Sequence, residues 1–93
     1  MPRHNFRKLT IWIDGIEFVK MNYSLTKTFP KHEKFNLTSQ MNRCAVSIPS
    51  NIAEGSAKST DAHFKLFLET SLGSAFEWET QLMICFRQKF ISK

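Results

Sequence analysis

The chain has 93 residues, of which 42% are hydrophobic and nine are Phe, and its formal net charge is +5. This length fits one domain over residues 1–93, and the high apolar content argues against a disordered chain. No apolar run approaches the ~20 residues that span a bilayer. The polar, basic stretch from Met1 to Lys8 does not resemble a signal peptide. These features exclude a membrane partner and predict a cytoplasmic protein.

A first helix is predicted from about residue 8 to residue 28. Its apolar residues form two sets at helical spacing on nearly opposite sides: Leu9, Trp12, Ile16, Val19 and Tyr23, and Ile11, Phe18 and Leu25. A helix that is apolar on two sides needs more than one neighbour. Pro30 ends the segment, because proline cannot continue a helix interior.

A second helix is predicted from about residue 36 to residue 55, where Gly55 is a fitting C-terminal stop. One apolar stripe runs along it: Leu37, Met41, Cys44, Ile48 and Ile52. Pro49 lies inside this pattern. Because the stripe stays in phase across the proline, we expect a kink in one continuous helix, with a full break as the alternative.

A third helix is predicted from about residue 61 to residue 89, with Ser59 or Thr60 as the N-cap and Asp61 in the first turn. Its apolar residues form one broad face with flanking residues: Phe64, Leu68, Leu72, Ala75, Leu82 and Phe86, flanked by Phe76, Trp78 and Met83. Signals for strands are absent, because no alternating run is bounded by turns. The expected fold class is therefore all-α, a helical bundle of three long helices.

Polar residues of the second helix recur at intervals of three and four and form one stripe: Gln40, Arg43, Ser47, Asn51 and Glu54. The third helix carries a comparable set that includes Ser74, Glu77 and Gln81. We expect this polar stripe to be largely buried against the third helix or a neighbouring subunit, with Glu77 or Gln81 among its partners. Arg43 should then meet a carboxylate, since a buried charge must be paired. The alternative is a ligand or nucleic-acid groove lined by Arg43, Asn51 and Glu54.

Basic residues gather near the helix ends, where they are candidates for contact with RNA or DNA: Arg7 and Lys8; Lys27, Lys31 and Lys34; and Arg87 and Lys89. The alternative is that they only keep the helix ends soluble. Catalytic and metal-binding patterns are absent. The three histidines are isolated, none pairs at i, i+4, and there is no phosphate-binding glycine loop. We therefore expect no enzymatic activity, no cofactor and no metal, and we expect Cys44 and Cys85 to be buried free thiols.

The run from Leu37 to Gly55, LTSQMNRCAVSIPSNIAEG, resembles the signature of a bacterial four-helix-bundle family. Some members of that family are encoded within intervening sequences of large-subunit ribosomal RNA genes. Further matches extend the resemblance over residues 6 to 91: Trp12, Tyr23, Thr26, Phe29-Pro30, Gly73-Ser74, Glu77 and Glu79 to Leu82. Two positions depart from the pattern, since Asn42 stands where Arg is common and Cys44 where Ala is common.

The resemblance implies an antiparallel up-and-down bundle that assembles as a ring, typically a pentamer. It also implies kinship with the accessory protein of diversity-generating retroelements, which works with a reverse transcriptase and nucleic acid. Family members carry a fourth helix after the Phe90-Ile91 region, which is absent from this chain of 93 residues. The apolar faces of the first and third helices are then either covered by another subunit or left exposed as a liability.

Together these observations predict a non-enzymatic, homo-oligomeric accessory or scaffold protein that binds nucleic acid through its basic helix ends. The alternative is a purely structural or vestigial protein of a mobile insertion that has no nucleic-acid partner.

Overall fold

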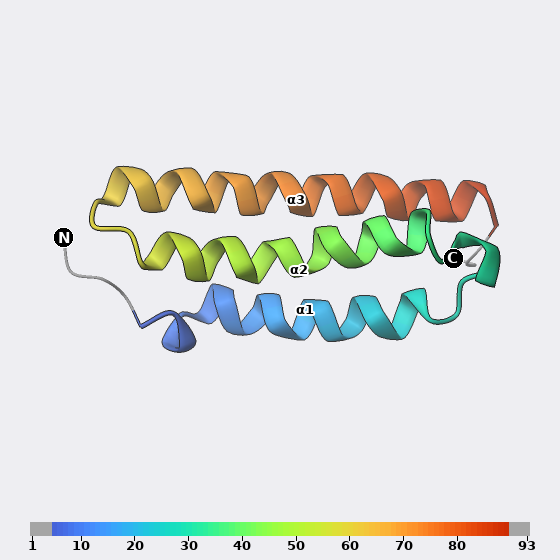
Figure 1. Cartoon of the computed structure of the whole chain (residues 1–93), viewed down its shortest axis with the longest axis horizontal. Coiled ribbons are helices and arrows are strands. Elements are labelled where there is room, and N and C mark those ends of the chain that lie inside the picture. Colours follow the sequence, from blue (N-terminus) through green and yellow to red (C-terminus); the bar gives the residue numbers. More distant parts are fainter. Residues whose placement is uncertain (1–4, 90–93) are drawn as a thin grey trace.

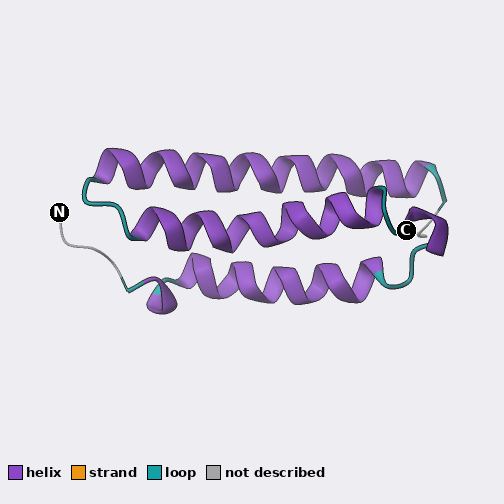
Figure 2. Ribbon diagram, in the orientation of Figure 1, coloured by secondary structure: helices purple, strands orange, loops and turns teal. Residues whose placement is uncertain are grey.

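A computed structural model describes residues 5–89. It contains three long helices and two short 3-10 helices: η1 (Phe6–Lys8), α1 (Thr10–Thr26), η2 (Lys31–Glu33), α2 (Leu37–Ser56) and α3 (Asp61–Arg87). No strand occurs within the described range (Figure 2), which confirms the all-α prediction. The three helices run side by side and reverse direction at each turn, so the arrangement is up, down, up (Figure 1).

The helix ends follow from local sequence. The Thr60 side chain caps α3 by accepting a hydrogen bond from the backbone N–H of His63 at 3.2 Å. This resolves the predicted choice between Ser59 and Thr60. At the end of α1, the Thr28 hydroxyl donates to the Leu25 carbonyl at 2.7 Å. The first helix is therefore two residues shorter at this end than predicted, because a turn begins before Pro30.

Pro49 lies within a continuous α2, which confirms one helix and excludes the break. Opposite it, α1 presents Gly15, where a Cβ atom would lie 3.1 Å from the Pro49 Cβ. A larger residue at this point would push the helices apart. The smallest side chain in α1 thus lets the two backbones approach at the proline.

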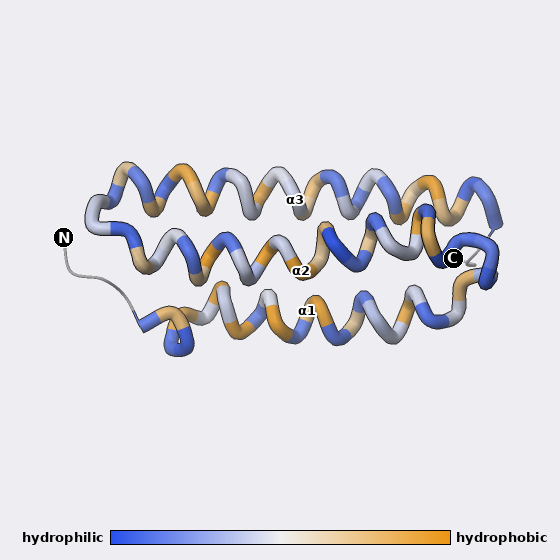
Figure 3. Tube along the Cα trace, in the orientation of Figure 1, coloured by the Kyte–Doolittle hydropathy of each residue, from blue (hydrophilic) through white to orange (hydrophobic). Residues whose placement is uncertain are grey.

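The core is centred on α2, with α1 and α3 packed on two sides of it. The predicted apolar stripe of α2 is confirmed, since four of its five members are buried and Ile48 is half-buried. Phe18 of α1 meets Trp78 of α3 edge-on, with ring centroids 4.7 Å apart. Apolar residues nevertheless recur around and along α1 and α3 (Figure 3), so a single contact with α2 cannot cover them all.

The buried face of α3 differs from the predicted one. Its buried residues are Ser71, Trp78, Gln81 and Cys85. Leu72 and Phe76, which were expected on the packed face or beside it, are 56% and 60% exposed. The spacing of apolar residues could not show which side of α3 is buried, because apolar residues lie on both sides of this helix. The small Ser71 faces α2 and donates its hydroxyl to the Ile48 carbonyl at 3.0 Å.

A buried polar network joins all three helices. The indole N–H of Trp78 donates to Asn22 Oδ1 at 2.8 Å. The Asn22 amide group donates in turn to Asn42 Oδ1 at 2.7 Å, and the Thr26 hydroxyl donates to the same oxygen at 2.9 Å. Asn22 is fully buried, with 0% of its surface exposed. We call these four residues the Asn22 network.

Replacing either of two glycines with alanine should change the free energy of unfolding, but in opposite directions. At Gly55 an added Cβ would lie 2.6 Å from the Phe67 Cβ, whereas at Gly73 nothing lies within 4 Å. Gly55→Ala should destabilise the fold by about 1–3 kcal/mol through overpacking. Gly73→Ala should stabilise it by up to about 1 kcal/mol, since alanine is the better helix former. Urea unfolding monitored by circular dichroism measures both, and equal effects of the two variants would contradict the packing at Gly55.

Removing the Asn22 side chain should lower the free energy of unfolding by more than the loss of its packing volume alone would. Asn22→Ala leaves the buried Trp78 N–H without its acceptor, whereas Asn42 Oδ1 keeps its hydrogen bond from Thr26. Because one buried group left unpaired costs ~1–3 kcal/mol, the free energy of unfolding should fall by at least about 1 kcal/mol. Ser24→Ala, an exposed change on the same helix, is the control and should stay within about 0.5 kcal/mol. Similar unfolding midpoints for the two variants would show that the network does not stabilise the fold.

Candidate functional site

The helix arrangement brings two of the three predicted basic clusters together. Because α1 ends, α2 begins and α3 ends on the same side of the bundle (at the right in Figure 1), their flanking cations share one end. All of them are exposed. We call this surface the basic end, and it comprises Lys27, Lys31, Lys34, Arg87 and Lys89.

The third cluster lies elsewhere. Arg7 and Lys8 belong to η1, which precedes α1 and lies toward the opposite end of the molecule (Figure 1). The Arg7 guanidinium carbon sits 4.4 Å from the centroid of the Phe6 ring. The sequence indicated cations at helix ends, but only the fold determines which ends meet.

The charges of the basic end are not neutralised within residues 5–89. The ion pairs in this range are Lys20 with Glu17, at 3.4 Å, and His32 with Glu33, at 3.6 Å. Glu33 Oε1 also accepts a hydrogen bond from the backbone N–H of Leu37 at 3.4 Å, in the first turn of α2. The basic end has five cations and Glu33 offsets one of them, so the surface keeps a net positive charge suited to an anion.

The polar stripe is less buried than predicted. Within the chain Gln40, Arg43 and Glu54 are exposed, and Ser47 and Asn51 are half-buried. Arg43 makes no ion pair among residues 5–89, so its expected carboxylate partner is not found there. Burial against α3 is thus wrong for these three residues. Gln40 and Arg43 instead line an open hollow whose other side includes Ser74 and Glu77 of α3. Burial against another subunit stays a prediction.

Part of the expected seam between the two polar sets does form. The hydroxyls of Ser47 and Ser74 lie 2.6 Å apart, and the Asn51 amide donates to the Ser47 carbonyl at 2.8 Å. Gln81 is buried, and its Oε1 has no hydrogen-bond partner within the described residues, while Glu77 is exposed. The seam therefore rests on serine hydroxyls rather than on the long charged side chains.

Both cysteines are buried free thiols, as predicted. Burial raises the pKa of the Cys44 thiol, and the Glu77 carboxylate beside it raises that pKa further. Burial likewise raises the pKa of Cys85, whose thiol donates to the Met41 sulfur at 3.6 Å. A raised pKa reduces the thiolate fraction, which is the nucleophilic and metal-binding form, so these residues act as core side chains.

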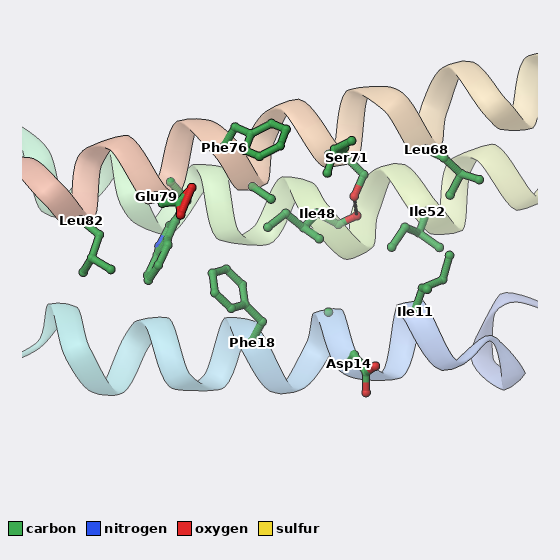
Figure 4. A pocket seen from close by; sticks show the side chains of 14 residues that line it. Ile11, Asp14, Phe18, Ile48, Ile52, Leu68, Ser71, Phe76, Glu79 and Leu82 are labelled. Carbon is green, nitrogen blue, oxygen red and sulfur yellow. Dashed lines mark hydrogen bonds between the residues drawn. The ribbon is translucent and has the colours of Figure 1, made fainter.

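An apolar groove opens between α1 and α3, with α2 as its floor (Figure 4). Its volume is about 710 Å³. Its apolar lining comes from all three helices: Ile11 and Phe18, Ile48 and Ile52, and Leu68, Leu72, Ala75, Phe76, Trp78 and Leu82. The charged residues that line it, Asp14 and Glu79, are both acidic. This groove lies where the apolar faces of the first and third helices were expected to lack a partner.

Within residues 5–89, no cluster of three or more His, Cys, Asp or Glu side chains is arranged to hold a metal ion. In the same range, no helix is both long and apolar enough to cross a bilayer.

Comparison with protein families gives a match over residues 7–93 to the 23S rRNA-intervening sequence protein family. The chain belongs to this family. The match confirms the intervening-sequence part of the resemblance, and its range includes the signature run in α2 and the whole of α3. No curated protein matches the chain.

In this member of the 23S rRNA-intervening sequence protein family, Asn42 has a structural role. Its carboxamide oxygen accepts two hydrogen bonds within the Asn22 network. An arginine in its place has no acceptor and could not make these two bonds. Asn42 therefore helps to join α1 to α2.

Sequence reasoning missed two features of the surface and core. Asn22 and Trp78 were not linked, because a polar residue within an apolar helix gives no sign of its partner. The exposed pair Lys34 and Phe35 was also missed, since an isolated aromatic residue in a loop suggests core packing. A cation directly beside an aromatic residue was the available signal.

Proposed function

We propose that this protein is a non-enzymatic, self-associating helical-bundle protein that binds RNA or DNA in the cytoplasm as an accessory or scaffold protein. The proposal of nucleic-acid binding rests on the basic end. Its lysine and arginine side chains come from two separate chain segments, residues 27–34 and 87–89, and they outnumber the carboxylates beside them within the described residues. Cations that gather without carboxylate partners are the electrostatic footprint of phosphate binding.

Self-association would strengthen such a site. The apolar groove supports assembly, because its exposed rim residues Leu72 and Phe76 gain by leaving water. The family resemblance implies a ring, typically a pentamer. If the helices of a cyclic ring run along its axis, every subunit places its basic end on the same face. Several weak phosphate contacts then act together on one nucleic-acid chain.

The second candidate is a purely structural protein without a nucleic-acid partner. The exposed apolar side chains of α3 favour it, since they need a protein partner whether or not phosphate binds. The two candidates differ in whether the basic end is used, so a binding experiment separates them.

Neutralising part of the basic end should weaken nucleic-acid binding. The triple variant Lys27→Gln, Lys31→Gln, Lys34→Gln removes three positive charges. If each contacts a phosphate, the slope of log K against log salt should become shallower by about 2–3. Fluorescence anisotropy with a labelled RNA, measured at several salt concentrations, gives this slope.

The matched control removes the same charge from elsewhere. Lys20→Gln, Lys58→Gln and Lys65→Gln change three cations that lie outside the basic end and are not among the predicted nucleic-acid contacts. If both triple variants lose affinity equally, binding reflects net charge and not this surface. If the wild-type chain binds neither RNA nor DNA at low salt, the purely structural candidate is preferred.

Self-association should depend on the apolar groove. We expect an oligomer at micromolar concentration, and Leu72→Lys with Phe76→Lys should shift it toward monomer. Both residues are more than half exposed, so the monomer should stay folded. Multi-angle light scattering measures the mass. The control pair Met21→Lys and Met83→Lys changes residues of similar exposure outside the groove. A well-folded wild-type monomer would refute self-association.

A further inference from the structure

A second groove borders the basic end. It runs between the C-terminal half of α1 and the N-terminal half of α2, with a volume of about 730 Å³. Its lining includes two aromatic residues, two cations and two hydroxyl residues: Tyr23 and Phe35, Lys34 and Arg43, and Thr38 and Ser39. We call it the aromatic groove. Lys34 belongs both to this groove and to the basic end, so the two surfaces are continuous.

The aromatic residues of this groove are unusually exposed. Phe35 is 89% exposed and Tyr23 is 47% exposed. Burying a phenylalanine is worth ~1.5–3 kcal/mol, and the chain gains almost none of this at Phe35. The Lys34 ammonium lies 5.3 Å from the centroid of the Phe35 ring. A flat apolar ring and a cation are thus presented to solvent together.

The charge and polarity of the groove restrict its partner. Both charged residues in its lining, Lys34 and Arg43, are cations, and neither has an ion-pair partner among residues 5–89. The Thr38 and Ser39 hydroxyls lie beside them and can donate to phosphate or ribose oxygens. The partner should therefore be anionic and should also have flat apolar faces.

We propose that the aromatic groove binds unpaired nucleotides of an RNA or DNA strand. Bases stack on Phe35 and Tyr23, while Lys34 and Arg43 bind the neighbouring phosphates. Exposed aromatic rings next to cations are the usual means of binding single strands. A base can stack in this way only when it is unpaired. The inference rests on the proposed function, since the basic end brings the strand to the groove.

A second copy of the groove is a poorer occupant. If the groove packed against the same groove of a second chain, Lys34 and Arg43 of both chains would lie in one interface. Like charges placed together at an interface oppose association.

The test compares single-stranded and duplex probes. A labelled 12-nucleotide RNA strand and a hairpin duplex of similar charge are titrated with the full chain by fluorescence anisotropy. Phe35→Ala should weaken binding of the single strand about 5- to 150-fold, the range for one lost base stack. It should leave duplex binding unchanged. Phe35→Trp, which keeps a flat ring, should retain single-strand affinity.

The control is an apolar residue outside both grooves. Leu66→Ala removes an apolar side chain that is 57% exposed and lines neither groove, and it should change neither affinity. If Phe35→Ala binds the single strand as wild type does, the inference is overturned, while the basic-end triple variant still tests the proposed function. If Phe35→Ala changes the light-scattering mass and weakens both probes equally, the groove is a subunit interface. If the wild type binds neither probe, both proposals fail.

Discussion

Asn22 fixes how the three helices sit against one another. Its carboxamide accepts from the Trp78 indole of α3 and donates to the Asn42 side chain of α2. The backbones of α1 and α3 do not approach closely, since each packs on α2. The network and the adjoining contact between Phe18 and Trp78 therefore link the two outer helices. A buried polar network is favourable only when its members are in register, so it specifies one axial alignment.

This alignment determines the surfaces. With Asn22, Asn42 and Trp78 at one level, the C-terminus of α1, the N-terminus of α2 and the C-terminus of α3 fall at the same end of the bundle. Cations that are distant in sequence then form the basic end. Beside the contact between Phe18 and Trp78, which both line it, the apolar groove opens over Ile48 and Ile52 (Figure 4).

The two grooves differ in the partner that they suit. The apolar groove is lined by aliphatic and aromatic side chains with only acidic charges, a combination suited to a protein segment. The aromatic groove has only cationic charges and joins the basic end, a combination suited to a phosphate-bearing strand. One small bundle can thus offer assembly and nucleic-acid contact without competition between them. That separation supports the scaffold role that we propose.

The sequence by itself determined the helices and much of the core. The stripe from Leu37 to Ile52 predicted the buried face of α2, because one side of that helix alone is apolar. Its unbroken phase across Pro49 predicted the continuous helix, and the signature run indicated the family. These are local properties, since periodicity and helix caps depend on neighbours within a few turns.

Only the tertiary structure decided which sides of the other helices are buried and which helix ends meet. On α3, apolar residues occupy several sides, so the burial of Ser71 instead of Leu72 depended on its packing against α2. The pairing of Asn22 with Trp78 spans 56 positions of sequence, a separation at which no periodic pattern gives information. Arg43 was expected to be buried within a seam and instead lines an open groove, because the orientation of α3 fixed the limit of that seam.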